Sequence, residues 1–294
     1  MDTRFPEPDC DQVRAMVTKQ FPEWTGLEIR PVDVSGWDNR TFHLGETLLV
    51  RMPSAIHYVA QVDKEQEWLP TLSRFISLSI PAPVAKGAPC AEFPQPWSIY
   101  RWIPGETLAS NTNIDQMALA RALAGFLREL QAISISGAPR PGPHCFYRGA
   151  HLDVYDAETR QALDALADSV DVDAASAVWN RALESPYQGK PVWFHGDIAP
   201  GNLLLTGGRL SAVIDFGCCG VGDPACDLAF AWTDLQPAAR ERFLSDVGSG
   251  DEMTSRAMGW ALWKALIVAA DCADRSSPSW HRSMKTIHRV LANA

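Results

Sequence analysis

The stretch that decides the fold runs from Val192 to Asp227 and reads VWFHGDIAPGNLLLTGGRLSAVIDFGCCGVGDPACD. Three polar side chains, Asp197, Asn202 and Asp215, interrupt this otherwise apolar sequence. Apolar runs flank the turn residues 206–209 (Thr-Gly-Gly-Arg), a pattern typical of a tight β-hairpin. The hairpin would bring Asn202 and Asp215 side by side at its open end, and Asp197 precedes it on a loop broken by Gly and Pro. The sequence therefore predicts that two carboxylates and one amide converge at one strand end.

Oxygen ligands of this kind suit Mg²⁺, which proteins usually bind through few side chains plus phosphate oxygens. Protein kinases place a catalytic Asp first, a metal-binding Asn five residues later, and then a D-F-G whose Asp binds metal. The same order is present here in Asp197, Asn202 and Asp215-Phe216-Gly217. The alternative is that Asp197 only caps a loop, because Asp and Asn are ordinary turn residues. Agreement at three positions favours a phosphoryl-transfer site.

The composition predicts a globular protein large enough for two lobes, since 294 residues with 46% hydrophobic content can bury a sizeable core. The net charge of −9 argues against a nucleic-acid partner. The polar N-terminus is not a signal peptide, and the apolar segment 260–270 is too short to span a membrane. The seven cysteines and the histidines lack metal-ligand spacing, so we expect reduced thiols, no zinc and a cytoplasmic protein.

The N-terminal third predicts three strands, at residues 27–33, 41–44 and 47–51. Ser35 and Gly36 belong to the turn that follows the first of them. A glycine turn between strands can lie over the phosphates of a nucleotide, because backbone N–H groups approach closely where no Cβ intervenes. A plain hairpin turn is the alternative.

Arg51 follows an apolar run, at the place where a kinase carries the lysine of its third strand. Its guanidinium offers a planar fork of donors that suits phosphate oxygens. Glu65 lies fourteen residues on, in an expected short helix, and could hold Arg51 against a nucleotide. Glu67 is the alternative partner, and solvated surface charges are the alternative interpretation of the whole set.

The boundary between two lobes is expected near Ile103, where a β-prone aromatic run ends at Pro104-Gly105. This hinge could bind an adenine edge. Helices are expected after it, at residues 114–132, 157–168, 173–184, 237–247, 252–274 and 278–292. The predicted fold class is α+β and protein-kinase-like, with an N-terminal nucleotide-binding lobe of antiparallel sheet over residues 1–103. Residues 104–294 would form a larger, mainly helical lobe with the catalytic loop, the metal site and the substrate cleft.

Aromatic and acidic residues of the C-terminal region could line that substrate cleft. Asp234, Trp263 and Asp271 are the candidates we select. The alternative is that Trp263 belongs to the core, because it stands at helical spacing from Trp260 and buried aromatic residues are the commoner case.

The chain resembles the aminoglycoside phosphotransferase family, small-molecule kinases with a protein-kinase-like fold. The resemblance covers about residues 30 to 235 and rests on these motifs: 194–202 (FHGDIAPGN), 213–217 (VIDFG), 222–229 (GDPACDLA), and, more loosely, 36–39 (GWDN), 49–51 (LVR), Glu65 and 102–106 (WIPGE). One departure is Arg51, because the better-characterised resistance kinases often carry Lys there.

The resemblance implies a role for each matched position. Asp197 would be the catalytic residue that receives or orients the substrate hydroxyl. Asn202 and Asp215 would hold Mg²⁺. His195 and Asp227 would brace the catalytic loop.

The resemblance also implies where the phosphate donor, ATP or GTP, would bind. Arg51, braced by Glu65, would contact its phosphates, and Ser35 and Gly36 would lie over them. Backbone groups of Arg101 and Ile103 would meet the base.

The function expected from these features is nucleotide- and Mg²⁺-dependent transfer of a γ-phosphate to a hydroxyl of a small molecule, with an aminoglycoside or macrolide antibiotic as the family-level acceptor. Two alternatives stay open: a metabolic kinase of the choline, homoserine or sugar type, and a catalytically silent nucleotide-binding protein. A metal-dependent phosphoesterase would need histidine ligands that the motif lacks. The expected partner is the hydroxylated substrate, not a nucleic acid or a membrane, and the sequence leaves the oligomeric state open.

Overall fold

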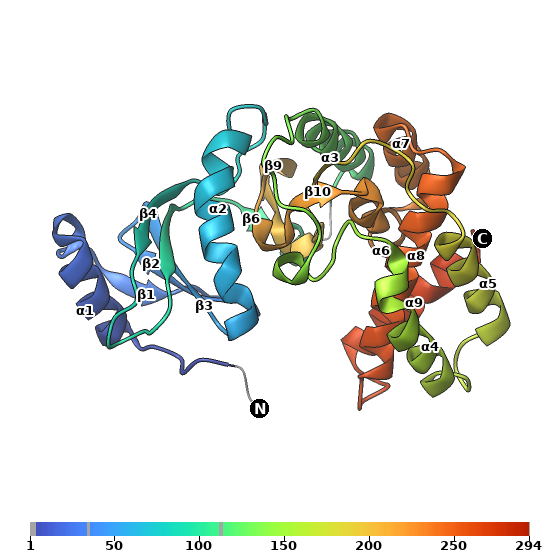
Figure 1. Cartoon of the computed structure of the whole chain (residues 1–294), viewed down its shortest axis with the longest axis horizontal. Helices are drawn as coiled ribbons and strands as arrows, with labels where there is room; N and C mark the ends of the chain where they lie inside the picture. The colour runs from blue at the N-terminus through green and yellow to red at the C-terminus, as the bar shows by residue number, and fades with distance from the viewer. Residues whose placement is uncertain (1–3, 34–35, 112–113, 294) are drawn as a thin grey trace.

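The computed structural model describes residues 4–33, 36–111 and 114–293, and its elements form two lobes (Figure 1). The N-terminal lobe is built on one antiparallel sheet with strand order β1-β2-β3-β5-β4. Its strands are β1 (Ile29–Pro31), β2 (Asn39–Leu44), β3 (Leu48–Pro53), β4 (Pro83–Gly87) and β5 (Trp97–Arg101). Helix α1 (Cys10–Gln20) packs on this sheet, and Val13, Met16, Val50 and Trp97 lie in the core between them. This small core supports β3, the strand that carries Arg51.

Helix α2 (Val59–Leu72) follows β3 and lies between the sheet and the rest of the chain in Figure 1. Its last turn carries Leu69 and Leu72, which belong to the hydrophobic core of the C-terminal lobe. Its first half carries three buried polar residues, Gln61, Lys64 and Glu65. The helix is therefore anchored to the C-terminal lobe by apolar packing while its polar residues face the site between the lobes.

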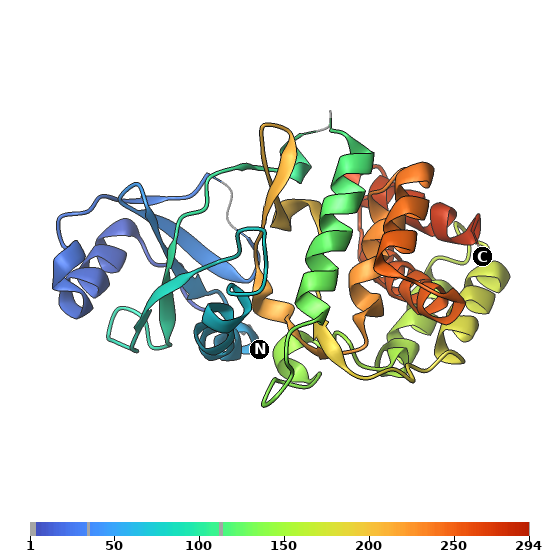
Figure 2. The same cartoon turned by 90° about the horizontal axis from the view of Figure 1, so that it is seen from above.

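The C-terminal lobe combines two small sheets with a helical body. The sheets contain β6 (Glu106–Thr107), β8 (Leu203–Thr206) and β9 (Arg209–Val213), and the pair β7 (Val192–Phe194) and β10 (Gly220–Gly222). The α-helices are α3 (Gln116–Gln131), α4 (Asp156–Ala165), α5 (Val172–Leu183), α6 (Phe230–Thr233), α7 (Pro237–Val247), α8 (Asp251–Ala270) and α9 (Pro278–Leu291). Helix α3 lies beside the β8–β9 hairpin (Figure 2).

Short 3-10 helices connect these elements: η1 (Pro22–Trp24), η2 (Ile56–Tyr58), η3 (Leu108–Ser110), η4 (Pro143–Cys145), η5 (Leu152–Tyr155), η6 (Pro200–Asn202), η7 (Phe216–Cys218) and η8 (Pro224–Ala229).

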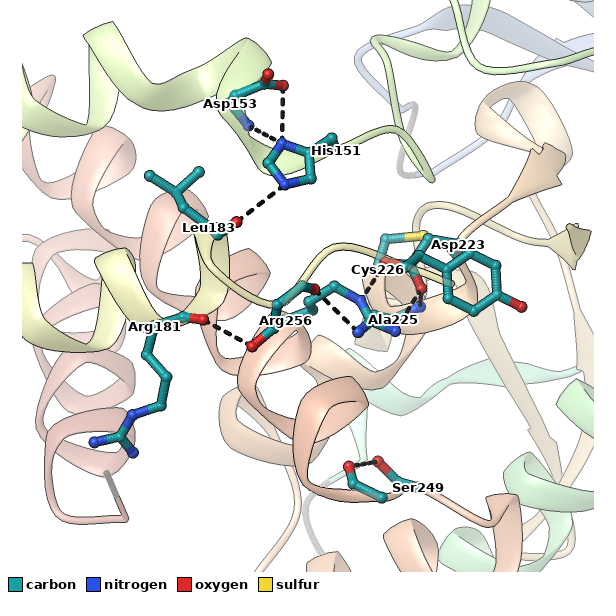
Figure 3. Close-up of polar contacts among 12 residues, drawn as sticks. His151, Asp153, Arg181, Leu183, Asp223, Ala225, Cys226, Ser249 and Arg256 are labelled. Atoms are coloured by element: carbon teal, nitrogen blue, oxygen red, sulfur yellow. Dashed lines mark hydrogen bonds and ion pairs between the residues drawn. The ribbon is translucent and has the colours of Figure 1, made fainter. Parts of the chain in front are cut away.

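A buried ion pair fixes the segment after β10 to helix α8 (Figure 3). Arg256 Nε lies 2.6 Å from Asp223 Oδ2, and Arg256 Nη2 lies 3.3 Å from Oδ1. The remaining donor group, Nη1, lies 3.2 Å from the carbonyl oxygen of Ser185. Because Asp223 Oδ1 also accepts from the backbone N–H of Ala225, the pair is satisfied inside the protein. It holds η8, and with it Asp227, at a fixed distance from the body of the lobe.

The predicted hairpin is present, and Thr206-Gly207-Gly208-Arg209 is its turn. Both central glycines have positive φ angles, of 57° and 74°, as a two-residue hairpin turn of the primed type requires. Helix α7 has the predicted bounds, and α9 ends one residue early. The short pair β7–β10 was not expected, because three-residue strands show no periodicity. No helix in the described parts of the chain combines the length and apolarity that a bilayer span needs.

Candidate active site

The loop after β7 is fixed by one buried carboxylate, that of Asp227. Its Oδ2 accepts the backbone N–H of His195 (2.8 Å) and its Oδ1 accepts the N–H of Gly196 (2.7 Å). Burial raises the pKa of Asp227 to about 7, and the two N–H donors oppose that rise. Gly196 has a φ of 84°, and a Cβ there would stand 2.6 Å from the carbonyl oxygen of Cys218, so only glycine fits. The chain is thereby forced to turn at the residue before Asp197.

His195 is fully buried and takes part in two hydrogen bonds that fix its tautomer. Its Nδ1 accepts the N–H of Asp197 (3.2 Å), so its Nε2 carries the hydrogen and donates to the carbonyl oxygen of Ile214 (3.1 Å). Burial lowers the pKa of this imidazole, although the charges of Asp197 and Asp215 oppose the shift. A neutral histidine therefore joins the catalytic loop to the strand end that carries Asp215.

The three polar residues of the decisive stretch converge as predicted. Asn202 Nδ2 lies 2.9 Å from both the carbonyl oxygen and Oδ2 of Asp197. The N–H of Ile214 bonds to the carbonyl oxygen of Asn202, which closes the open end of the hairpin beside Asp215. Asp215 itself has a left-handed backbone, with φ of 66° and ψ of 70°. Such a conformation is costly for a non-glycine residue and occurs most often at functional sites.

Arg51 reaches the same point from the other lobe. Its Nη1 lies 3.3 Å from Glu65 Oε2 and its Nη2 lies 3.1 Å from Asp215 Oδ1. Burial alone would lower the pKa of Arg51, but Glu65 and Asp215 raise it above its ordinary value. The hydroxyl of Tyr100 donates to the same Glu65 oxygen, while Glu65 Oε1 is buried with no hydrogen-bond partner. The predicted partner of Arg51 is thus Glu65 and not Glu67.

Lys64 is a site residue that the sequence reasoning missed. It is buried, and its Nζ donates to the carbonyl oxygens of Gly217 (2.6 Å) and Cys219 (3.0 Å) and lies 3.1 Å from His144 Nδ1. It therefore ties α2 to the loop after Asp215. The only signal in the sequence was its place next to Glu65, which is too weak to distinguish it from a solvated lysine.

Asp38 is a second residue that the sequence reasoning did not select. Its pKa is raised to about 6, chiefly by burial and also by Asp215 and Asp197, whereas a hydrogen bond from Tyr58 and the charge of Arg51 oppose the rise. These influences place Asp38 among the charged groups of the catalytic loop and β3. The only feature of the sequence that points to Asp38 is its place in the turn that also contains Gly36.

Four further predicted nucleotide contacts belong to the N-terminal lobe. Gly36 is exposed, with open space where a Cβ would stand, and Ser35 lies outside the described residues. The N–H of Arg101 is taken by the carbonyl oxygen of Ala82 (2.9 Å), so it is not available to a base. Among the described residues, no hydrogen bond engages the backbone of Ile103, the better candidate of the two.

The three predicted substrate residues do not form one cluster. Trp263 is 4% exposed, and its Nε1 donates to Glu158, so it is a core residue. Asp271 is exposed at the end of α8. The carboxylate of Asp234 accepts a hydrogen bond from the hydroxyl of Thr233. Burial raises the pKa of Asp234, although the cations of α9 oppose the rise. The joint substrate cleft therefore stays a prediction, and these three side chains lie in different surroundings.

The predicted metal ligands offer a small oxygen set. Because Asn202 directs its Nδ2 at Asp197, its Oδ1 has no partner among the described residues, and the same is true of Asp215 Oδ2. Nowhere in residues 4–33, 36–111 and 114–293 do three or more His, Cys, Asp or Glu residues gather as a metal site would require. One carboxylate and one amide oxygen fit Mg²⁺ that takes its remaining ligands from phosphate and water.

Comparison with known proteins agrees with this geometry. A model of the phosphotransferase enzyme family (APH) matches residues 28–264, most of the chain. The chain belongs to this family. The resemblance inferred from the motifs is thereby confirmed, and this phosphotransferase is an enzyme of the class that transfers phosphate to hydroxyl groups.

Two curated relatives are aminoglycoside 3'-phosphotransferases. The enzyme of Streptomyces fradiae is 29% identical over 191 residues, which are 58% of this phosphotransferase and 67% of that enzyme. The enzyme of Escherichia coli is 28% identical over 172 residues, 53% of this chain and 60% of the relative.

Solved structures extend the similarity to the whole fold. The GDP complex of an aminoglycoside 2'-phosphotransferase-IIIa aligns with a TM-score of 0.71 at 18% identity and covers 97% of this phosphotransferase and 99% of that chain. The apoenzyme of a macrolide 2'-phosphotransferase from Brachybacterium faecium aligns with a TM-score of 0.59 at 18% identity, covering 96% and 98%. At such identities the likeness is one of fold, and it confirms the predicted kinase-like α+β class.

Proposed function

We propose that this chain transfers the γ-phosphate of ATP or GTP to a hydroxyl group of a small molecule. The observation that supports this most strongly is the convergence of Asp197, Asn202 and Asp215 from the C-terminal lobe with the Arg51–Glu65 pair from the N-terminal lobe. Phosphoryl transfer needs positioning and charge neutralisation, and this set supplies both. The solved relatives named for complexes with GDP, ADP and ATP agree with a nucleotide donor.

In this proposal Asp197 accepts a hydrogen bond from the acceptor hydroxyl and aligns its oxygen with the γ-phosphorus. Asn202 fixes the Asp197 carboxylate by donating to it. Asp215 and Asn202 would hold Mg²⁺, which supplies charge neutralisation on the phosphates when bound. Arg51, held by Glu65, would contact the phosphates once it leaves Asp215 Oδ1. His195 and Asp227 hold the loop and take no part in the chemistry. Two parts of the N-terminal lobe would contact the nucleotide. They are the loop of Ser35 and Gly36, and the backbone of Ile103.

The acceptors to test first follow from the names of the relatives, which act on aminoglycosides and macrolides. A choline, homoserine or sugar kinase activity stays the alternative. The seven free cysteines agree with the cytoplasm as the place of reaction, where the nucleotide is available.

The decisive experiment is a screen of hydroxylated antibiotics and metabolites for transfer of labelled phosphate from ATP and GTP, with Asp197→Ala as the paired variant. We expect transfer to fall by about 10²–10⁴-fold in Asp197→Ala, because a positioned acid–base group contributes this much. Nucleotide binding, measured by calorimetry with Mg²⁺, should stay near the native value in Asp197→Ala and be lost in Asp215→Ala. Native turnover in Asp197→Ala would refute its assigned role, and unchanged nucleotide affinity in Asp215→Ala would refute the metal role.

A further inference from the structure

The buried middle of helix α8 carries one exposed side chain, that of Lys264. Every residue from Arg256 to Leu266 is buried except Lys264, which is exposed. Because its ten neighbours are buried, Lys264 marks the one position where this stretch of the helix faces solvent. No hydrogen bond or ion pair joins Lys264 to any of the described residues. A lysine with no ion-pair partner in an otherwise buried helix stretch is unusual.

Arg148 is a second cation near Lys264, and it contacts the catalytic loop directly. Its Nε donates to the carbonyl oxygen of Gly196 (3.1 Å), the residue before Asp197. Its guanidinium carbon lies 4.5 Å from the ring centre of Trp263, and the Lys264 ammonium lies 5.8 Å from the same ring. Arg148 Nη1 is buried and has no hydrogen-bond partner. Both cations are therefore grouped around one indole next to the catalytic carboxylate.

The electrostatics agree with this placement. Desolvation lowers the pKa of Lys264, Arg148 lowers it further, and Asp197 and Asp38 oppose the shift. They agree with the geometry, in which Lys264 and Arg148 both lie over the ring of Trp263. The carboxylate nearest to Trp263 is Glu158, which accepts from the indole Nε1.

We propose that Arg148 and Lys264 form an acceptor subsite that binds an anionic group, such as a carboxylate or phosphate, of the hydroxylated substrate. This inference rests on the proposed phosphotransferase function and narrows its acceptor class. Asp215 and Arg51 already pair with each other, and the nucleotide would enter on their side of Asp197. Arg148 and Lys264 lie instead against Trp263 of helix α8, and the proposal places the acceptor on that side. A polycationic aminoglycoside would meet like charges there, whereas a hydroxy acid or a sugar acid would be attracted.

Three pyranoses that differ mainly in charge test the proposal: glucuronate, glucose and glucosamine. Each is titrated by calorimetry into the full-length protein loaded with Mg²⁺ and a non-hydrolysable nucleotide, and its phosphorylation is followed by mass spectrometry. We expect glucuronate to bind most tightly and glucosamine most weakly. In Lys264→Glu the affinity for glucuronate should fall by about tenfold, the loss of one charge-assisted hydrogen bond, and that for glucosamine should rise.

Lys264→Gln should abolish the preference for glucuronate over glucosamine without reversing it. Lys190→Glu makes the same change of charge at another exposed lysine and should leave the order of the three affinities unchanged. Equal affinities for the three sugars, tighter binding of glucosamine by the native protein, or an unchanged order in Lys264→Glu would each overturn the subsite. If the order of binding holds while no acceptor is phosphorylated, the subsite stands and the proposed transferase function fails.

Discussion

Two arginines of this phosphotransferase hold carboxylates, but they do so in different ways. Arg256 and Asp223 are 5% and 6% exposed, belong to one lobe, and leave no oxygen of the carboxylate without a donor. Arg51 divides its two terminal nitrogens between Glu65 and Asp215, which come from different lobes. Glu65 keeps one buried oxygen without a partner. The first cluster is complete in the folded protein, whereas the second is incomplete.

The first cluster is suited to stabilising the fold, and the second is suited to exchanging one partner for a ligand. A satisfied ion pair inside one lobe gains nothing from a ligand, and its cost appears only when one partner is removed. A cation that bridges two carboxylates across a cleft can exchange one of them for a phosphate oxygen at little cost. Substitutions in the two clusters should therefore affect different measurements.

The largest effect is expected for Arg256→Met. The substitution leaves Asp223 buried without its counter-ion, so the free energy of unfolding should fall by about 3–5 kcal/mol. Urea unfolding at neutral pH measures this, and phosphate transfer per folded molecule should stay within about threefold of native. The double variant Arg256→Met/Asp223→Asn should regain part of the lost unfolding free energy, because the buried charge without a partner is then gone. Native stability in Arg256→Met would mean that the two clusters do not differ as argued.

Arg51→Met should affect phosphate transfer more than it affects stability. We expect kcat/KM to fall by about 10²–10³-fold, the usual effect of removing one positioned charge-stabilising donor. The unfolding free energy should also fall, because the buried Glu65 loses its counter-ion, whereas Asp215 is 26% exposed and water can solvate it. Steady-state kinetics and urea unfolding on the same preparation measure both quantities. Arg51→Lys is the conservative control: a full rescue would show that charge alone matters and that the fork geometry does not.

A smaller effect concerns Asp38, whose pKa is raised from 3.8 to about 6 by burial and by Asp215. Because the folded-state pKa lies above the ordinary value, the native protein loses stability as the pH rises through this range. Asp38→Asn removes that loss, on the order of 1–3 kcal/mol for about two pKa units in a partly buried group. The thermal midpoint of the variant, without nucleotide, should exceed the native midpoint at pH 8 but not at pH 4. Asp164→Asn, at an exposed position of α4, is the control. Its thermal midpoint should differ from the native midpoint by the same amount at both pH values.

The sequence was sufficient for the decisive stretch because its information is local. The glycine turn and the alternation of Leu203 to Val213 predict the hairpin, and the hairpin by itself brings Asn202 and Asp215 together. The pairing of Arg51 with Glu65 was also predicted, but only by analogy with a kinase strand and helix. The different surroundings of Asp234, Trp263 and Asp271 were not predictable, because the direction in which a helix side chain points depends on what packs against it.

What the sequence by itself determined is the reaction class, since the residues that carry it lie within one stretch whose turns are encoded by glycine and proline. The tertiary structure alone decided the surroundings of that stretch. It brought Lys64 and Asp38 to the loop of Asp215. It also left Lys264 exposed beside Arg148 while the rest of its helix turn became buried. The physical reason is that segments distant in the chain together set the charge and the burial of a side chain at a cleft. The sequence of one segment alone does not contain this information.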